Sequence, residues 1–158
     1  MKTTNNLFIP IFFFLLFANC GGGSSEKKES IAPPPKSMVE EEPALADPMD
    51  NKGVGPIKNV ELGEIDLAMV EEGKQIYQTM CILCHKPDQK HIGPAPKGIL
   101  GRRSPEWIMN MILNPEVMVI EDPIAKQLLA DFYGAPMANQ NLTEEQARKV
   151  LEYFRTLE

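Results

Sequence analysis

Two of the chain's three cysteines and one of its two histidines lie within five consecutive positions. The segment from Met80 to Lys86 reads MCILCHK, so that Cys81, Cys84 and His85 form the pattern C-x-x-C-H. This pattern is typical of the covalent attachment of a c-type haem. We therefore expect one covalently bound haem c as the cofactor of this chain.

Two other kinds of site also use paired cysteines, and both need more than this sequence offers. A redox-active dithiol opens a helix that follows a strand, whereas Cys81 and Cys84 follow a predicted helix. A structural zinc site needs four ligands. Here it would have to combine the two cysteines with His91 and a carboxylate, and it would leave His85 unused. Both alternatives explain the pattern less well than haem does.

Residues 66–158 must position this pattern, and their apolar side chains recur at the spacings of three and four that indicate α-helices. No alternating apolar and polar run of the strand type occurs in this part of the sequence. The first predicted helix ends at Cys81 and carries on one face Leu67, Val70, Gly73, Ile76, Tyr77 and Met80. The haem pattern is therefore expected at the C-terminal end of a helix.

Three further helices are indicated by capping residues and prolines. A Ser-Pro pair at 104–105 supplies an N-cap and a first helical residue, and an Asn-Pro pair at 114–115 ends that helix. An Asp-Pro pair at 122–123 begins a short helix that ends near 133–134, and the last helix starts at the capping box TEEQ at 143–146. Helices this short bury little apolar surface on their own. We expect a small all-α domain built around the haem.

The first 19 residues have the features of an export signal. Residues 7–18 read LFIPIFFFLLFA, twelve positions without a charge. This run is shorter than the roughly 20 apolar residues that cross a membrane, but it suits the centre of a signal peptide. Residues 16–20 resemble the lipobox of bacterial lipoproteins, although Phe17 and Asn19 depart from its usual residues. We expect a signal peptide at 1–19 and a lipid on Cys20; a plain signal peptide cleaved nearby is the alternative.

The segment from 20 to 65 is rich in Gly, Ser and Pro and has almost no large apolar residues that could form a core. Between Gly21 and Ile65 it contains 5 Lys against 9 Asp and Glu. Such a composition predicts a disordered acidic tether. We therefore expect a lipid-anchored flexible linker at 20–65, followed by the helical domain at 66–158.

Residues 66–158 resemble a class I c-type cytochrome. The features that match are Gly73-x-x-x-Tyr77, the C-x-x-C-H pattern at 81–85, Gly93-Pro94, Pro136-Met137, and Val150 with Tyr153. The resemblance implies that the first and last helices cross where Gly73 meets Tyr153. One departure is Pro96, which stands where the family commonly has Leu.

The resemblance also implies a role for each residue of the attachment site. Cys81 and Cys84 would form thioethers to the haem vinyl groups. His85 would bind the iron through one ring nitrogen and donate its other N–H to the carbonyl of Pro94, which sets the tautomer and the orientation of the ring. Arg102 and Trp107 stand where similar proteins present side chains to the haem propionates; a surface Arg and a core Trp are the plain alternatives.

Several methionines could supply the second iron ligand. Met109 and Met111 fall inside a predicted helix and are more simply packing residues. Met118 is expected in a loop and is a competitor. Met137 is favoured because it follows a Gly-Ala-Pro turn and precedes the capped last helix, as in the family that the chain resembles. A bis-histidine site with His91 is a weaker alternative.

A haem with His on one side of the iron and Met on the other has no open position for a substrate. We therefore expect a single-electron carrier of a bacterial respiratory chain and not an enzyme. Its partners would be redox proteins: a quinol-oxidising donor and a periplasmic reductase or oxidase as acceptor. The segments 104–116 (SPEWIMNMILNPE) and 136–154 (PMANQNLTEEQARKVLEYF) are similar to those of bacterial respiratory cytochromes near nitrous oxide reductases. The alternatives are a haem subunit of a fixed oxidoreductase complex and a gas sensor with a labile Met.

The charge pattern bears on where the chain works and what it meets. The net charge is -6, but residues 86–103 contain five basic residues and only Asp88, a local charge of five minus one, or +4. This basic segment would steer an acidic partner towards the haem edge; solvated loop charges or neutralised propionates are the alternatives. We expect a lipid-anchored monomer on the periplasmic side of a bacterial membrane, with no nucleic acid as partner.

Overall fold

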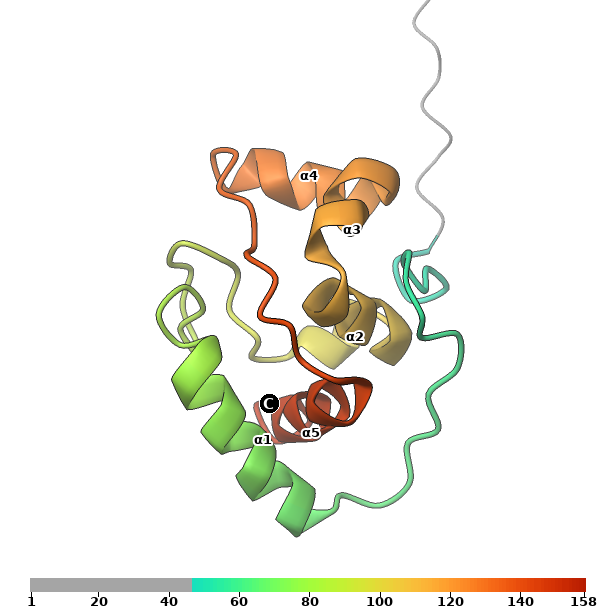
Figure 1. Ribbon diagram of the computed structural model, residues 1–158, viewed down its shortest axis with the longest axis vertical. Coiled ribbons are helices and arrows are strands. Elements are labelled where there is room, and N and C mark those ends of the chain that lie inside the picture. Colours follow the sequence, from blue (N-terminus) through green and yellow to red (C-terminus); the bar gives the residue numbers. More distant parts are fainter. Residues whose placement is uncertain (1–46) are drawn as a thin grey trace, which may run out of the picture. The chain divides into compact units, whose positions relative to one another are not determined.

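The computed structural model describes residues 47–158, and every regular element in that range is helical (Figure 1). The elements are α1 (Leu67–Met80), the 3-10 turn η1 (Ile99–Gly101), α2 (Pro105–Leu113), α3 (Pro115–Glu121), α4 (Pro123–Asp131) and α5 (Glu144–Phe154). The predicted all-α class is confirmed. The expected signal peptide, Cys20 and the linker up to residue 46 lie outside the described residues. None of the helices in 47–158 combines the length and apolar character that crossing a membrane requires.

Helix α1 begins and ends where its sequence indicates. The side chain of Asp66 caps it by accepting hydrogen bonds from the backbone N–H groups of Ala68 and Met69, and Cys81 is its C-cap. The face towards the core is narrower than the apolar pattern suggested, because Leu67 remains 77% exposed. Gly73 and Tyr77 are the residues that α1 buries.

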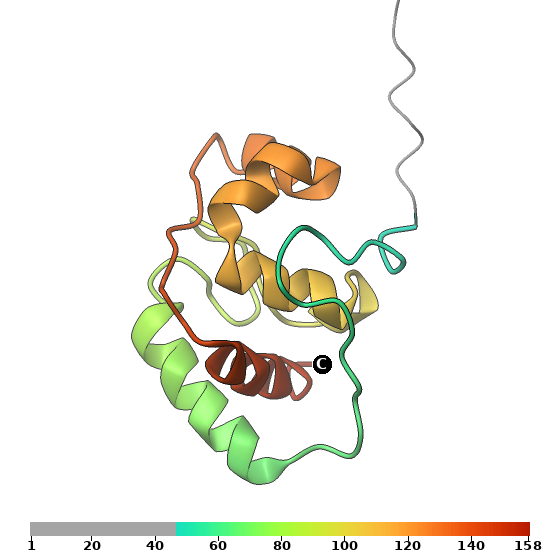
Figure 2. The same cartoon turned by 45° about the vertical axis from the view of Figure 1, so that its right-hand side comes forward.

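Helices α1 and α5 lie side by side and cross closely (Figures 1 and 2). A Cβ at Gly73 would overlap the carbonyl oxygen of Lys149 and lie 3.0 Å from the nitrogen of Val150. The predicted crossing at Gly73 is confirmed, and the atoms nearest to such a Cβ belong to the backbone of Lys149 and Val150. The ring of Tyr153 packs on Tyr77, with 5.3 Å between the ring centroids.

Helices α2, α3 and α4 follow one another with a single residue between them, and each begins with a proline. Ser104 caps α2 and Asp122 caps α4, as the sequence predicts. Helix α3 was not predicted. We expected Pro115 to end one helix and to lead into a loop, but proline suits the first position of a helix because it lacks only an N–H that is unbonded there. Pro115 therefore begins α3.

The last helix starts with the predicted capping box. The backbone N–H of Thr143 donates to the side chain of Gln146 over 2.9 Å, and the N–H of Gln146 donates to the hydroxyl of Thr143 over 3.2 Å. Helix α5 packs against both α1 and α2. The core between these helices includes Tyr77, Trp107, Ile108, Val150, Leu151 and Phe154.

Residues 47–65 form an ordered arm that runs along α2 before the chain enters α1 (Figure 2). Ile57 is only 8% exposed, and its N–H and C=O bond to the side-chain amide of the fully buried Asn110 over 3.0 and 2.9 Å. The prediction of a flexible linker is therefore wrong for this part of 20–65, and the ordered unit is longer than the expected 66–158.

Further polar contacts tie the arm to the helices. The amide of Asn51 donates to Asp122 over 2.6 Å, and the N–H of Val60 donates to Glu106 over 3.1 Å. Both carboxylates are buried. Composition could not reveal this arm, because buried side chains on α2 satisfy several of its backbone groups where an apolar stripe would otherwise be needed.

Candidate cofactor site

A cavity of about 240 Å³ opens between the helices, an order of magnitude more than one buried water needs. Its walls come from the end of α1, the loop that follows it, α2, α4, α5 and the segment between α4 and α5. The structure brings every predicted cofactor-binding residue of the domain to this cavity: Cys81, Cys84, His85, Pro94, Arg102, Trp107 and Met137. Most of the other lining side chains are apolar.

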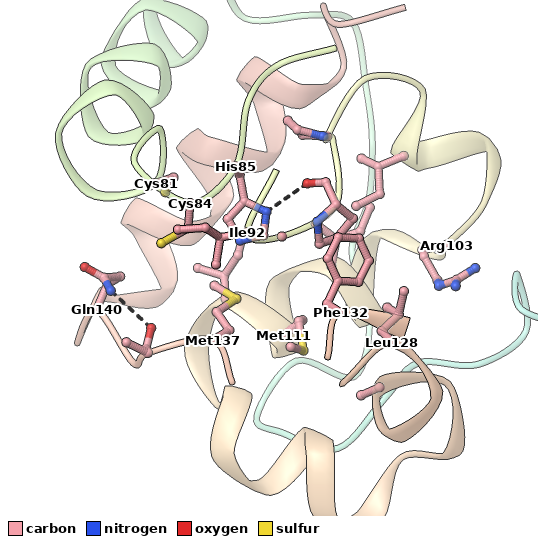
Figure 3. A pocket seen from close by; sticks show the side chains of 18 of the residues that line it. Cys81, Cys84, His85, Ile92, Arg103, Met111, Leu128, Phe132, Met137 and Gln140 are labelled. Atoms are coloured by element: carbon pink, nitrogen blue, oxygen red, sulfur yellow. Dashed lines mark hydrogen bonds between the residues drawn. The ribbon is translucent and has the colours of Figure 1, made fainter. Parts of the chain in front are cut away.

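The two cysteines form one edge of the cavity, where α1 ends in a tight turn (Figure 3). The N–H groups of Cys84 and His85 both donate to the carbonyl of Cys81, over 3.1 and 2.9 Å. Both thiols are free. Burial, and secondarily the neighbouring Cys84, raises the pKa of Cys81 to about 11.

These properties do not suit the two alternative kinds of cysteine site. A reactive dithiol works as the thiolate, whereas burial raises the pKa of Cys81 to about 11 and so favours the protonated thiol at neutral pH. The described residues also contain no group of three or more His, Cys, Asp or Glu side chains that could hold a metal ion. His91 is exposed and does not line the cavity.

His85 presents one ring nitrogen to the protein and leaves the other free. Its Nδ1 lies 2.8 Å from the carbonyl oxygen of Pro94, as predicted. A carbonyl can only accept, so Nδ1 carries the proton and Nε2 keeps a lone pair for a metal ion. Gly93 allows this approach, because a Cβ there would lie 2.7 Å from His85 Nδ1. The hydroxyl of Tyr77 donates to the backbone carbonyl of His85 and fixes the turn.

Met137 lies in the segment between α4 and α5 and points into the cavity that His85 also faces (Figure 3). Met80 and Met111 line the cavity as well, Met80 from the end of α1 beside the cysteines and Met111 from α2. The segment of Met137 contains no helix, and it contributes the side chain of Met137 to the cavity wall.

Met118 is not a competitor, and its predicted loop position was wrong. It lies in α3 and is fully buried. Its sulfur accepts a hydrogen bond from the N–H of Val54, 3.0 Å away, and a Cβ at Gly53 would lie 2.8 Å from it. The ordered arm therefore holds Met118 away from the cavity. Met109 is buried in α2 and does not line the cavity either.

Trp107 and Arg102 line the cavity, but their polar atoms are bonded to the protein. The indole N–H of Trp107 donates to Asp122 over 3.0 Å, so a group of the protein satisfies this N–H while the side chain lines the cavity. The guanidinium of Arg102 donates to the carbonyls of Lys97 and Ala95, over 2.9 and 3.1 Å.

Arg103 is a cavity residue that the sequence analysis missed. Its Nε is buried and has no hydrogen-bond partner, and its guanidinium lies 5.3 Å from the centre of the Trp107 ring. Burial lowers the pKa of Arg103, Arg102 lowers it further, and Asp122 opposes them. A buried donor without an acceptor is costly, and an anionic group in the cavity would satisfy it. The pair Arg102-Arg103 gives no sequence signal to say which side chain is buried.

The arrangement fits a haem c. Two thiols and an imidazole with a free Nε2 stand at one side, a thioether faces the same space, and the walls are apolar. The orphan donor of Arg103 lies at the far side from the cysteines (Figure 3). These groups match the vinyl edge, the iron and the carboxylates of such a cofactor.

Comparisons with known proteins agree with this chemistry. A family model described as "Cytochrome c" matches residues 70–158. A solved structure of a cytochrome c from Rhodothermus marinus is 45% identical, with a TM-score of 0.63 over 65% of this chain and 89% of that one. An engineered variant, Rma TDE, is 45% identical with a TM-score of 0.62, over 65% of this chain and 90% of that one. The same variant bound to a carbene intermediate is 44% identical with a TM-score of 0.60, over 65% of this chain and 89% of that one. No curated protein matches the chain.

Proposed function

Because the chain belongs to the cytochrome c family, we propose that it is a class I cytochrome that carries single electrons, with His85 and Met137 as the iron ligands. The covalently bound haem c supplies a one-electron iron couple, and ligation by His and Met raises its reduction potential. The observation that carries the proposal is that His85 and Met137 face into one apolar cavity at whose edge the two cysteines stand.

His85 contributes a fixed direction of ligation. The hydrogen bond from Nδ1 to Pro94 holds the tautomer, and Gly93 lets the loop backbone pack directly against the ring. A ligand held in this way keeps its geometry in both oxidation states, and little rearrangement accompanies the gain or loss of an electron. This rigidity suits a carrier.

Met137 would occupy the position opposite His85 and leave no room for a substrate. Met118, the main competitor, is held by the arm, and His91 lies outside the cavity. A closed iron site favours electron transfer over bond chemistry. It also favours a carrier over a gas sensor, because a sensor requires Met137 to leave readily.

Electrons would pass through the edge of the cavity at the cysteines, where the surface is apolar. Met80, Leu83 and Ile92 are 46%, 76% and 49% exposed there. Exposed apolar groups beside basic residues suit a transient redox interface, since charge steers the encounter and apolar contact brings the edges together. Lys86 and Lys90, which follow the haem pattern in the chain, are such basic residues.

The cellular setting that we propose rests on the sequence of residues 1–20. A lipid on Cys20 would hold the protein at the periplasmic side of a bacterial membrane. There it would take electrons from a quinol-oxidising donor and pass them to a reductase such as nitrous oxide reductase, or to an oxidase. In this reading the protein acts as a monomeric carrier of a respiratory chain.

The ligation can be tested by absorption spectroscopy of the holoprotein. A Met-ligated ferric haem has a weak charge-transfer band at the red end of the visible spectrum. Met137→Ala should abolish this band, whereas Met111→Ala, which also alters a methionine of the cavity wall, should retain it. If Met111→Ala or Met118→Ala abolishes the band and Met137→Ala does not, the assignment of the ligand is wrong.

A further inference from the structure

The segment that carries Met137 is held weakly by its own hydrogen bonds. Every hydrogen bond of residues 132–142 joins positions no more than five apart, as in the bonds from Gly134 to Leu129 and from Gln140 to Ala138. Ala135 and Pro136 are exposed. The position of Met137 therefore depends on its packing and on how the two ends of the segment are fixed. The capping box at Thr143 fixes one end.

Lys90 contacts the other end of this segment, where α4 ends. It lies in the loop after the haem pattern, and its Nζ donates to the carbonyl of Asp131 over 3.1 Å. The same ammonium group lies 4.3 Å from the ring centre of Phe132 and 5.9 Å from that of Tyr133. Helix α4 has no basic residue in its last turn. Lys90 thus supplies the cation that the carbonyl end of α4 favours.

The residues that Lys90 touches control the path of the chain to Met137. Phe132 lines the cavity, so that Lys90 covers part of the cavity wall from outside. The next two residues turn the chain with positive φ, 58° at Tyr133 and 74° at Gly134. A residue other than glycine keeps such a conformation only where its surroundings hold it, and Tyr133 is 95% exposed. Lys90 is a contact that can hold this turn.

We propose that Lys90 is a positioning residue for Met137. By joining the loop of His85 to the end of α4, it holds the segment 132–142 over the cavity and keeps the sulfur of Met137 within reach of the iron. The inference rests on the proposed ligation by Met137. Its consequence is that loss of the Lys90 contacts opens the Met137 side to small molecules in solution.

The first test measures imidazole binding to the oxidised holoprotein. Imidazole must displace Met137, so its apparent affinity rises with the fraction of open molecules. Lys90→Gln should tighten imidazole binding by about fivefold, in keeping with the loss of one exposed cation–π contact and one charged hydrogen bond. Lys90→Arg should restore the wild-type affinity. Lys126→Gln is the matched control, because it removes an exposed charge from α4, the helix whose end Lys90 contacts. Equal affinity in wild type, Lys90→Gln and Lys126→Gln would overturn the proposal.

The second test separates this inference from the proposed ligation. Backbone amides of residues 133–142 should exchange hydrogen faster in Lys90→Gln than in wild type, with amides of α1 unchanged, whichever residue binds the iron. Unchanged exchange in that segment would refute the role of Lys90 even if Met137→Ala removes the charge-transfer band. If exchange is faster in Lys90→Gln but the charge-transfer band survives Met137→Ala, the ligand assignment is wrong. Lys90 would then hold the segment 132–142 in place without positioning an iron ligand.

Discussion

Gly73 of α1 and Lys149 of α5 bring the backbones of the two helices into direct contact. A Cβ on Gly73 would overlap the carbonyl oxygen of Lys149 and lie 2.5 Å from its carbonyl carbon. Backbone atoms cannot rotate away as a flexible side chain can. This crossing holds the end of α1, and with it the turn of Cys81 to His85, at a fixed place relative to α5, which also lines the cavity.

Gly73→Ala should therefore lower the free energy of unfolding by about 2 kcal/mol or more, because the helices must separate to admit a methyl group. Urea unfolding of the holoprotein, followed by circular dichroism, measures the change. Gly63→Ala is the control, since a Cβ there has no atom within 4 Å. Equal stability of the two variants would show that the crossing is not tight.

Asn110→Ala should detach the arm. The side chain is fully buried and makes three hydrogen bonds, to the N–H and C=O of Ile57 and to the C=O of Lys52. Their loss leaves backbone groups unpaired and should cost about 3 kcal/mol of stability. Trypsin should then cleave after Lys52 or Lys58 faster than in Asn59→Ala, a change at an exposed neighbour. Unchanged cleavage would mean that the arm is held by other contacts.

Glu152 should contribute to stability in a pH-dependent way. Burial alone would raise its pKa, but hydrogen bonds from Arg148, the N–H of Asp66 and Arg155 outweigh burial and lower the pKa below the ordinary 4.5. A lowered pKa in the folded protein gives stability that is present above pH 4.5 and is lost as pH falls through the folded value.

The free energy of unfolding of the wild type should fall as the pH drops from neutral into the acid range. In Glu152→Gln this fall should be smaller, because the titrating carboxylate is absent. Denaturant unfolding across this pH range measures it. Glu61→Gln, at an exposed position of the arm, should show the same loss of stability in acid as the wild type. An identical pH dependence in Glu152→Gln and wild type would rule out this carboxylate as its source.

The basic segment should make electron transfer sensitive to salt. Reduction of ferricyanide, an anionic oxidant, should slow by about tenfold as ionic strength rises from about 0.01 M to about 0.15 M, where the Debye length shrinks from about 30 to about 8 Å. Lys86→Glu with Lys97→Glu should slow it further at low salt without altering the absorption spectrum. A cationic oxidant is the control and should show the opposite trend. A rate indifferent to salt with both oxidants would leave the segment without a role in docking.

The proposed lipid anchor at Cys20 can be tested by cell fractionation. Two acyl chains or more give stable attachment to a membrane, whereas a single chain does not, and a lipoprotein-type Cys20 would carry such a set. Cys20→Ala should move the haem protein from the membrane fraction to the soluble fraction. Recovery of the wild type in the soluble fraction would contradict the lipid anchor.

Local signals in the sequence were enough to locate most helices. The starts of α2, α4 and α5 follow from caps and prolines because these residues satisfy or remove the free N–H groups of a first turn. At Pro115 the same rule is ambiguous, because a proline can follow the end of one helix or occupy the first position of the next. Only packing against α4 shows that the chain continues as a helix there.

The gathering of Cys81, His85 and Met137 around one cavity was also expected, because the motif and its family resemblance specify which residues meet. The arm and Arg103 could not be found in this way. The arm is held by single buried polar contacts, such as Asn110 with Ile57, which leave no periodic pattern. Arg103 differs from Arg102 only in the direction that the turn before α2 gives its side chain.

The proposed closed site of a carrier is tested most directly by carbon monoxide. If His85 and Met137 both bind the iron, the reduced holoprotein at neutral pH should show the same absorption spectrum before and after exposure to carbon monoxide, and Met137→Ala should bind it at once. Rapid formation of a carbon monoxide complex by the wild-type protein would contradict the closed site and favour a gas sensor.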